Sequence, residues 1–418
     1  MAGLFILGGS TYYTLLLLQS LEKHGLSQNF SRIAIFGRNA DRLRLIAQAG
    51  SELVSGKVQI VATDKIADCL DPEYKILFNQ IRFGGLHARD TDEKIAMSVG
   101  LAADETIGIV GVSNAIRTIT GIETLVETLR AKTGNYTFLN FTNPCSIVCQ
   151  YLSEKLDARV IGICDYPAFM QHEIARAMGV PPDSVVLDYF GLNHFGFVHS
   201  LTIDGRDALN DTIAAQPSFM PECNRYFSTL LNISWSFVFE AERITARQLS
   251  KPNRADSLLQ IESACDALLA SGEARPGAYL EILAQRDCHW YNLAVSPVLA
   301  QLTGAKAQPV YINCAAGDAL QLGVEQTVIE ATCALRPDAI SFVPYPERLR
   351  ALPEYLLVRS MKQAELALLS GITSRQPDSI IGACLINPMI SSLDATQRYF
   401  SKLCEIDADM RQFWKGAI

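Results

Sequence analysis

The chain has 418 residues, too many for one compact core, so we expect two closely packed domains. Hydrophobic residues make up 49% of the sequence and charged residues 19%, values typical of a globular protein and not of a disordered one. The net charge is -8 and no segment is rich in Lys and Arg, which argues against a nucleic-acid partner.

The first residues are expected to form a strand and not a signal peptide. Residues 1–7 carry no basic segment and lead directly into a glycine-rich turn. No apolar run is long enough to span a bilayer, so we expect a cytoplasmic protein with no membrane partner. The 11 cysteines include no Cys-x-x-Cys pair, and most are expected to be small buried residues.

Short apolar segments alternate with helical patterns over the first 165 residues. Strands are predicted at residues 4–7, 32–36, 58–62, 74–78, 137–140 and 160–163. This alternation predicts an α/β fold with a doubly wound parallel sheet of the Rossmann type over residues 1–165. Polar and glycine-rich segments follow these strands, at the edge where such sheets bind ligands.

Helical patterns dominate the rest of the chain. Strands are predicted there at residues 185–190, 198–203 and 309–312. We therefore expect residues 166–418 to form an α+β domain that binds the substrate and carries the oligomer contacts.

A candidate dinucleotide site follows the first predicted strand. Gly8, Gly9, Ser10 and Thr11 lie between that strand and a helical pattern, although they lack the full Gly-x-Gly-x-x-Gly spacing. One reading is a tight turn that needs a positive φ. The other, which we favour, is that the backbone amides and the helix N-terminus bind a pyrophosphate.

The end of the second strand bears on the choice of cofactor. Sites specific for NAD usually place Asp or Glu there, to bind the ribose 2′-hydroxyl. This chain has Gly37 followed by Arg38, whose guanidinium could bind a 2′-phosphate or could simply be solvated. The sequence predicts that NADP is accepted at least as well as NAD.

An ordered series of motifs resembles glycoside hydrolase family 4, which includes the 6-phospho-α- and 6-phospho-β-glucosidases. The resemblance extends through nearly the whole chain. The matching segments are the turn at residues 8–10, residues 79–85, Arg89, Glu105, residues 117–119, 141–144, 162–167 and 191–194, Arg286 with Tyr291, and residues 387–388.

The resemblance implies a fold like that of lactate and malate dehydrogenases, with NAD or NADP and a divalent metal, typically Mn, as cofactors. Cys164 and His194 match the family's metal ligands, and Asn79 and Ile81 are expected near the dinucleotide. Thiolate and imidazole also suit other transition metals, so the identity of the ion stays open. The resemblance further implies a homodimer or homotetramer.

The family mechanism begins with transfer of a hydride from C3 of the sugar to the nicotinamide. The ketone acidifies the C2 proton, a base removes it, and the group at C1 is eliminated. Water then adds and the hydride returns. Family members need no pair of catalytic carboxylates, unlike most glycosidases.

Several residues are assigned to the substrate by this resemblance. Asp165, directly after the metal cysteine, is a candidate general acid for the leaving oxygen, which would favour an α-linked substrate; alternatively it orients a metal ligand. Asn143, Asn193 and Arg286 are expected to contact the sugar. Arg89 is expected to bind a substrate phosphate or another acidic group.

The sequence departs from the family where the catalytic Tyr base is expected. By alignment that position is Trp235, and an indole only donates hydrogen bonds. A second departure lies at residues 286–291, where Asp287 and Cys288 replace two glycines and His289 follows. Either the base has moved, with His289, Tyr291 or Asp287 as candidates, or proton abstraction is lost.

Three functions remain open at this point: a glycosidase acting on a 6-phospho-glycoside, a sugar or hydroxy-acid dehydrogenase on the same fold, or a catalytically impaired cofactor- and sugar-phosphate-binding sensor. We favour the glycosidase with His289 as base, because an imidazole is suited to proton transfer near neutral pH. The alternative reading of His289 is a surface or packing residue.

Overall fold

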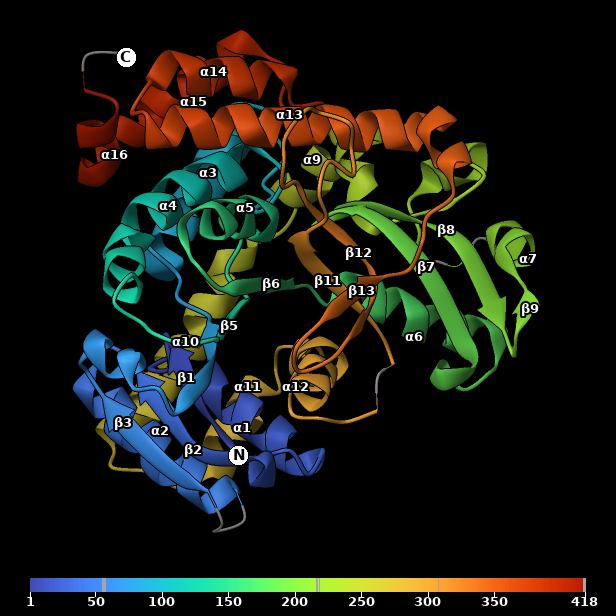
Figure 1. Ribbon diagram of the computed structural model, residues 1–418. Helices are drawn as coiled ribbons and strands as arrows, with labels where there is room; N and C mark the ends of the chain where they lie inside the picture. Colours follow the sequence, from blue (N-terminus) through green and yellow to red (C-terminus); the bar gives the residue numbers. More distant parts are fainter. Residues whose placement is uncertain (55–57, 216, 218, 307, 416–418) are drawn as a thin grey trace.

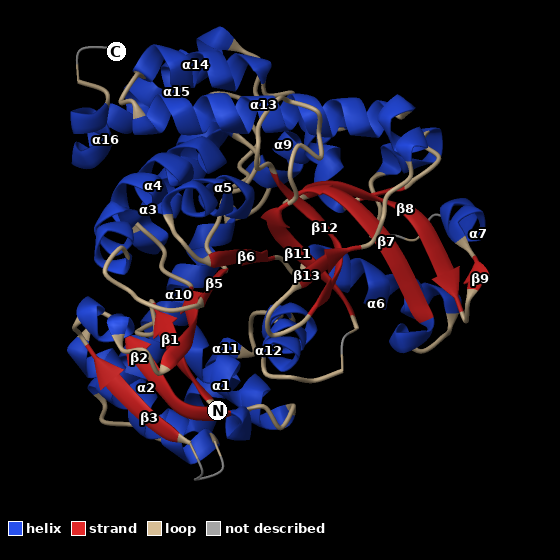
Figure 2. Cartoon of the chain, in the orientation of Figure 1, coloured by secondary structure: helices blue, strands red, loops and turns tan. Residues whose placement is uncertain are grey.

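The protein is described by a computed structural model that covers residues 1–54, 58–215, 217, 219–306 and 308–415. Within these residues thirteen strands form one sheet, in the order β10-β8-β7-β12-β11-β6-β5-β4-β1-β2-β3, with β9 beside β8 and β13 beside β12. The sheet runs through the whole molecule, and helices lie on both of its faces (Figure 1). Figure 2 shows that strands and helices alternate in the half that holds β1 to β6.

The strands are β1 (Ala2–Leu7), β2 (Phe30–Phe36), β3 (Gln59–Thr63), β4 (Tyr74–Asn79), β5 (Thr137–Asn140), β6 (Arg159–Ile163), β7 (Val185–Leu192), β8 (Phe195–Ile203), β9 (Arg206–Asp207), β10 (Leu230–Leu231), β11 (Pro309–Ala315), β12 (Val328–Leu335) and β13 (Ile340–Phe342).

The helices are α1 (Tyr13–Lys23), α2 (Ala40–Leu53), α3 (Gly85–Ser98), α4 (Ile109–Leu129), α5 (Cys145–Lys155), α6 (Tyr166–Met178), α7 (Leu209–Ala215), α8 (Ser236–Phe239), α9 (Ala241–Leu249), α10 (Arg254–Ala270), α11 (Pro276–Leu283), α12 (Ser296–Leu302), α13 (Pro353–Thr373), α14 (Pro377–Ile386), α15 (Leu393–Ile406) and α16 (Ala408–Phe413).

The six N-terminal strands are parallel and lie in the order β3-β2-β1-β4-β5-β6. This is the doubly wound arrangement of dinucleotide-binding domains. Leu7, the last residue of β1, lies in register between Phe36 of β2 and Asn79 of β4. The segments that follow these strands therefore meet at one edge. The predicted α/β fold with a doubly wound parallel sheet is confirmed.

The remaining strands are antiparallel and extend the same sheet. β11 pairs with β6, β12 with β11, β7 with β12, and β8 with β7. The sheet thus continues across residue 165, the predicted domain boundary. Helices from the second half also pack on the first. α10 packs against α3, α11 against α1 and α2, α13 against α4, and α15 against α3. The division into domains 1–165 and 166–418 stays a prediction.

The core lies where helices cover the sheet on both faces. In β1, Leu4, Phe5, Ile6 and Leu7 are all fully buried. A strand covered on both sides has no polar face, which explains why these strands read as continuous apolar runs and not as alternating patterns.

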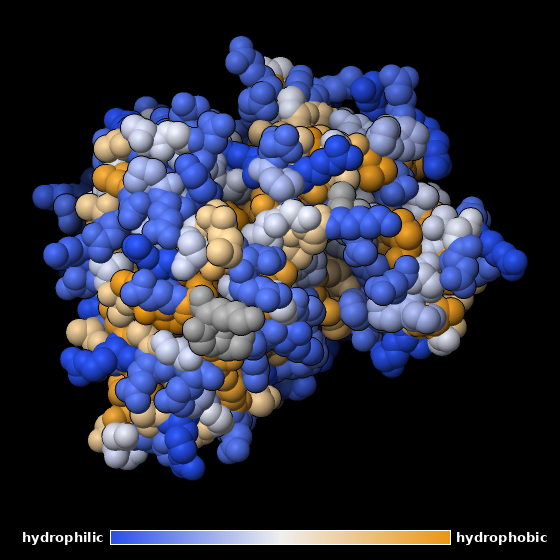
Figure 3. All heavy atoms as spheres, turned by 60° about the horizontal axis from the view of Figure 1, so that its bottom comes forward, coloured by the Kyte–Doolittle hydropathy of each residue, from blue (hydrophilic) through white to orange (hydrophobic). Residues whose placement is uncertain are grey.

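The face of the molecule shown in Figure 3 is mainly polar. Hydrophilic side chains cover most of it, and hydrophobic ones show between them in several areas. No helix of the described residues has the length and apolar character needed to cross a membrane. Exposed apolar residues also occur in α14 and α15, among them Ile386, Leu393 and Ile406.

Candidate functional site

The predicted cofactor loop lies between β1 and α1, beside the end of β4. Gly8 has a left-handed backbone, with φ +80°, and a Cβ there would lie 2.8 Å from the backbone nitrogen of Ile81. The structure thus brings Ile81 against the loop that holds Ser10 and Thr11. No side chain among the described residues caps the N-terminus of α1, while the amides of Thr14 and Leu15 in its first turn donate to the carbonyl oxygens of Thr11 and Tyr12 at 3.0 Å. The predicted binding of a pyrophosphate at this N-terminus stays a prediction.

The same loop is tied to the end of β2. Gly9 N donates to the carbonyl oxygen of Phe36 at 2.6 Å. Gly37, the next residue after β2, is buried beside the loop, and Arg38 is exposed. This is the side of a dinucleotide fold where the adenosine ribose binds, and the contact of Arg38 with a 2′-phosphate stays a prediction.

Asn79 is the last residue of β4 and lies inside the sheet. Its side chain is fully buried, and its Nδ2 donates to Asn140 Oδ1 at 2.9 Å and to Thr142 Oγ1 at 3.2 Å. Its Oδ1 accepts a hydrogen bond from Ile81 N at 3.2 Å. Asn79 therefore joins the ends of β4 and β5 and orients Ile81, while its predicted contact with the cofactor stays a prediction.

Cys164, Asp165 and Tyr166 follow β6 at the same edge of the sheet. Cys164 is 4% exposed, and Asp165 occupies the N-terminal cap position of α6. His194 lies in the turn between β7 and β8, in a left-handed conformation with φ 62°. The rings of Tyr166 and His194 pack edge to face with their centroids 4.5 Å apart. The hairpin and the end of β6 therefore meet at this point.

Asn193 lies beside both predicted metal ligands. It precedes His194 in the turn, and its side chain lies close enough to Cys164 to affect the pKa of that thiol. Burial, together with Glu330 and Asp165, raises the pKa of the Cys164 thiol well above its usual value. Burial lowers the pKa of His194, so its imidazole is neutral, as metal ligation requires.

The residues present fit a divalent cation. His194 Nδ1 is buried and has no hydrogen-bond partner in the described part of the chain. A buried ring nitrogen without a partner is unfavourable unless another group binds it. The described residues contain no group of three or more His, Cys, Asp and Glu side chains that could hold a metal. A site made by Cys164 and His194 would therefore leave coordination positions for substrate oxygens.

Glu330 is a buried carboxylate beside these residues that the sequence analysis missed. It lies in β12, is fully buried, and accepts a hydrogen bond from Asn313 Nδ2 at 2.6 Å and one from Asn193 Nδ2 at 3.4 Å. Burial raises the pKa of Glu330 to about 8. A charged residue inside a buried strand is rare unless it has a partner or a role, and this was the available signal.

The carboxyl of Asp165 lies within the influence of Arg286 and of two histidines. Burial raises its pKa, and His194, Arg286 and His289 oppose that effect. Arg286 and His289 belong to the segment between α11 and the π-helical turn Tyr291–Val295. The structure therefore brings this segment to the end of β6, as the resemblance implied.

Arg286 is held between two aromatic rings. Its guanidinium carbon lies 4.5 Å from the ring centroid of Trp290 and 5.2 Å from that of Tyr13, next to the cofactor loop. Its Nε is buried, with no hydrogen-bond partner among the described residues. Such a stacked guanidinium with a free donor is suited to an anionic or polyhydroxylated ligand.

His289 and Tyr291, two of the three candidate bases, differ in environment. His289 has a half-exposed side chain, and its Nε2 lies 2.5 Å from Asp287 Oδ1. Tyr291 is 3% exposed and donates its hydroxyl hydrogen to Gln80 Oε1 at 2.8 Å. Burial raises the pKa of Tyr291 above its ordinary value, which disfavours the phenolate that a base would need.

Trp235 belongs to the core. It is fully buried, it stacks on Phe195 with ring centroids 4.1 Å apart, and its Nε1 donates to the carbonyl oxygen of Gly196 at 2.9 Å. Its only polar group is therefore used in the fold.

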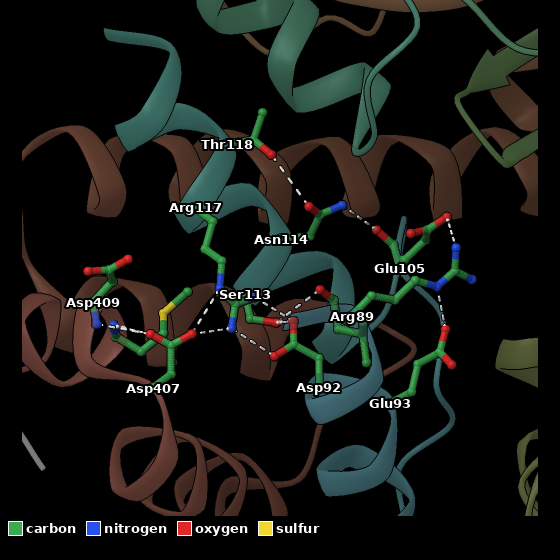
Figure 4. Close-up of polar contacts among 12 residues, drawn as sticks. Arg89, Asp92, Glu93, Glu105, Ser113, Asn114, Arg117, Thr118, Asp407 and Asp409 are labelled. Atoms are coloured by element: carbon green, nitrogen blue, oxygen red, sulfur yellow. Dashed lines mark hydrogen bonds and ion pairs between the residues drawn. The ribbon is translucent and has the colours of Figure 1, made fainter. Parts of the chain in front are cut away.

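Asn143 and Arg89 are also near the sheet edge. Asn143 follows β5, is half-buried, and its carbonyl oxygen accepts from Asn114 Nδ2 at 2.9 Å. Arg89 Nε donates to Glu93 Oε1 at 2.6 Å and Arg89 Nη1 to Glu105 Oε1 at 2.8 Å. Two carboxylates already balance this guanidinium (Figure 4). Its predicted contact with a phosphate stays a prediction.

Glu105 is ionised in this arrangement. Burial alone would raise its pKa, but the guanidiniums of Arg82 and Arg89 outweigh burial and hold the pKa well below its usual range. Arg82 Nη1 lies 2.7 Å from Glu105 Oε2.

The Arg117 motif forms a structural network. Arg117 makes two hydrogen bonds to Asp92, of 2.6 and 2.9 Å, and its Nη2 lies 2.8 Å from Asp407 Oδ2 (Figure 4). Ser113 Oγ donates to Asp92 Oδ2 at 2.8 Å. These contacts join α3, α4 and the start of α16, so we assign Arg117 to the fold.

Residues 4–180 match the sequence profile of the family 4 glycosyl hydrolases. A 6-phospho-beta-glucosidase of Thermotoga maritima is 29% identical over 203 residues, which are 48% of this chain and 48% of that protein. A 6-phospho-alpha-glucosidase of Leptotrichia buccalis is 31% identical over 199 residues, which are 46% of this chain and 44% of that protein. These alignments span about half the length of the curated relatives.

The fold extends the similarity over the full chain. The structure of a 6-phospho-beta glucosidase from Thermotoga maritima with NAD and glucose-6-phosphate superimposes with a TM-score of 0.84 and 20% identity, over 98% of this chain and 99% of that chain. A lactate dehydrogenase from a deep-sea metagenome superimposes with a TM-score of 0.55 and 14% identity, over 88% of this chain and 99% of that chain. The expected likeness to such dehydrogenases is confirmed. Residues 4–180 are thus similar to the family 4 glycosyl hydrolases, and the solved neighbours show that the whole chain has the fold of these proteins.

Proposed function

We propose that this protein hydrolyses 6-phospho-glycosides, using NAD or NADP and a divalent cation, in a reaction that oxidises the sugar transiently. The observation that carries the proposal is the packing of the His194 ring against Tyr166, two residues after Cys164, at the carboxyl end of β6. The cofactor loop after β1 lies at the same edge of the parallel sheet.

When bound, the nicotinamide would accept and later return the C3 hydride, and the cation would polarise the sugar oxygens as a Lewis acid. The chain holds the dinucleotide through the uncapped N-terminus of α1 and the loop at Gly8. Cys164 and His194 would hold the cation. The sugar would then lie between the end of β6 and the segment that carries Arg286.

Asp165 is placed to donate a proton to the leaving oxygen. It occupies the N-cap position of α6 directly after Cys164, and His194, Arg286 and His289 lie close enough to affect its carboxyl. Burial raises the pKa of this carboxyl, which favours the protonated form that an acid for the aglycone oxygen needs. An Asp here supports an α-linked substrate, and the test below offers both anomers.

His289 is placed to remove the C2 proton. Its Nε2 lies 2.5 Å from Asp287 Oδ1, so the ring is oriented by a carboxylate, as catalytic imidazoles often are. Tyr291 is the second candidate. Its hydroxyl hydrogen is directed at Gln80, and burial opposes its ionisation, so we prefer His289.

A phosphorylated sugar is supported by both the neighbour and the geometry. The Thermotoga maritima structure contains glucose-6-phosphate. In this chain Arg286 has a buried Nε without a partner in the described residues, whereas Arg89 has two carboxylate partners. Arg286 is therefore the better candidate to bind the substrate's anionic group, and Arg89 is the second candidate.

The proposal is tested with purified protein, Mn²⁺, reductant and either NAD⁺ or NADP⁺. The substrates are p-nitrophenyl α- and β-glucosides, each with and without a 6-phosphate. We expect nitrophenol release from a phosphorylated substrate, dependent on both cofactors, without net formation of NADH or NADPH. Steady accumulation of reduced cofactor would indicate a dehydrogenase instead. Cofactor binding with no turnover of any of the four would indicate a sensor.

A further inference from the structure

Glu330 occupies the middle of a row of residues that crosses four strands. Gly162 of β6 pairs with Asn313 of β11, Asn313 with Glu330 of β12, and Glu330 with Gly191 of β7. Residues two apart along a strand point to the same face of the sheet, so Gly162 and Cys164 face the same side. Glu330 therefore lies on the face of the sheet that carries the candidate cation site.

The side chains around Glu330 are arranged to donate to it. Asn313 Nδ2 lies 2.6 Å and Asn193 Nδ2 3.4 Å from Oε1, and the Tyr189 side chain lies close enough to influence the carboxyl. Tyr189 can occupy this position because residue 196 is a glycine: a Cβ there would lie 2.5 Å from the Tyr189 hydroxyl oxygen. Two amide donors therefore converge on one oxygen of the carboxyl.

Some polar atoms of this cluster have no partner. Glu330 Oε2, Asn193 Oδ1, Asn313 Oδ1 and His194 Nδ1 are all buried without a hydrogen-bond partner in the described residues. One unpaired buried atom can be tolerated, but four in one cluster have a substantial desolvation cost. The cost is understandable if the cluster is built around a ligand.

Asn193 is the connection between Glu330 and the candidate metal ligands. Its Nδ2 donates to Glu330 Oε1 at 3.4 Å, its side chain lies close enough to Cys164 to affect that thiol, and it immediately precedes His194 in the β7–β8 turn. A bond from Glu330 to this amide fixes the turn, and with it the direction of the imidazole. Groups that orient metal ligands in this way matter almost as much as the ligands themselves.

We propose that Glu330 is a positioning residue of the cation site, which acts through Asn193 to hold His194 and Cys164 in the geometry that binds a divalent metal. This inference rests on the proposed function, because it assumes that Cys164 and His194 bind the cation. Glu330 itself is not assigned as a ligand, in keeping with the two-residue site described above.

The test measures Mn²⁺ affinity by calorimetry on metal-free full-length protein, without substrate. Glu330→Gln keeps the shape of the side chain but replaces an acceptor oxygen with a donor. We expect its Kd for Mn²⁺ to rise about 10- to 100-fold. The matched control is Glu354→Gln: Glu354 is also buried, also has an unpartnered Oε2, and bonds to Thr229. It should bind Mn²⁺ like the wild type.

A double variant tests the route through Asn193. If Glu330 acts through this amide, Asn193→Ala combined with Glu330→Gln should bind Mn²⁺ no more weakly than the weaker single variant. Additive losses would overturn that route. Thermal unfolding without metal checks that each variant is folded. If Glu330→Gln does not fold, Asn313→Ala, which removes the donor to Glu330 Oε1, takes its place and is expected to weaken Mn²⁺ binding.

The possible failures are distinct. If folded Glu330→Gln binds Mn²⁺ like the wild type, the inference is overturned and the proposed function stays intact. The same holds for Asn313→Ala if that variant has to be used instead. Equal losses in Glu330→Gln and Glu354→Gln would also overturn it, because they would show a general effect of altering the core. A wild-type protein that binds no Mn²⁺ would instead contradict the metal site of the proposed function, and the inference with it.

Discussion

Gly37 and Ser10 are in direct contact at the cofactor loop: a Cβ at position 37 would lie 2.5 Å from Ser10 Oγ and 2.9 Å from Ser10 N. A side chain at position 37 would therefore displace the loop. The lack of an acidic residue at the end of β2 thus has a steric reason, in addition to any effect on the choice of cofactor.

The neighbouring Arg38 is expected to favour NADP. Arg38→Ala should weaken NADP⁺ binding about 10-fold, the equivalent of one charge-assisted hydrogen bond, and leave NAD⁺ affinity unchanged. Calorimetry with both dinucleotides measures this. Arg44→Ala, an exposed arginine on α2 paired with Asp41, is the control and should change neither affinity. A wild-type protein that strictly selects NAD⁺ would contradict the prediction.

His289→Ala tests the base. Loss of a general base lowers the rate of proton transfer by about 10²- to 10⁴-fold, so exchange of the C2 proton with solvent should fall by that factor. Tyr291→Phe should have a smaller effect, since its hydroxyl donates to Gln80. NMR in D₂O measures the exchange, with His24→Ala, on the exposed residue that ends α1, as the control. Exchange that is undiminished in His289→Ala would eliminate this role.

The Asp165→Asn variant tests whether Asp165 is the general acid and has no part in removing the C2 proton. A nitrophenol leaving group departs with little protonation, whereas an alkyl alcohol depends on an acid. We therefore expect the variant to lose about 10²-fold or more in kcat on an alkyl 6-phospho-glycoside, and much less on the nitrophenyl substrate. C2 exchange should persist. Equal losses on both substrates would instead indicate that Asp165 orients a metal ligand.

Asp407 should make stability sensitive to acid. Burial alone would raise its pKa, but hydrogen bonds from the Met410 amide and from Arg117 lower it below its usual value. A lowered pKa gives stability that is complete above the unfolded pKa, near 4, and is lost as pH falls through the folded value. Asp407→Asn keeps the helix cap and should cost about 1–2 kcal/mol at pH 7.

Chemical denaturation at several pH values checks this. The difference in free energy of unfolding between wild type and Asp407→Asn should narrow below pH about 4. Asp394→Asn is the control, because Asp394 forms an exposed pair with Arg398 that should contribute little. A difference independent of pH would show that charge is not the cause.

Much of the parallel sheet could be predicted from the sequence. Its strands are short apolar runs between helical patterns, and the structure reproduces all six, with β5 at the predicted residues. β12 was missed. Its sequence, Val328–Leu335, contains Glu, Ala, Thr and Cys, and nearly every residue is buried, so it shows neither the alternation of a half-exposed strand nor a purely apolar run.

Residues of the candidate site could be predicted where they belong to local sequence motifs. Cys164 and His194 belong to short segments that resemble the family, and the structure brings their surroundings together. Glu330 was not predictable, because its importance depends on pairing between β12, β11 and β7, which no local pattern specifies. The burial of Trp235 against Phe195 likewise depends on tertiary packing.

The most direct test of the account is the fate of the C2 hydrogen. The protein is incubated in D₂O with Mn²⁺, NAD⁺ or NADP⁺ and the p-nitrophenyl 6-phospho-glycoside that it cleaves, and the sugar product is analysed by NMR. The account predicts one deuterium at C2 in the released sugar phosphate, with no net reduced cofactor. Release of nitrophenol with protium retained at C2 would contradict it, because the bond would then have been cleaved without oxidation and elimination.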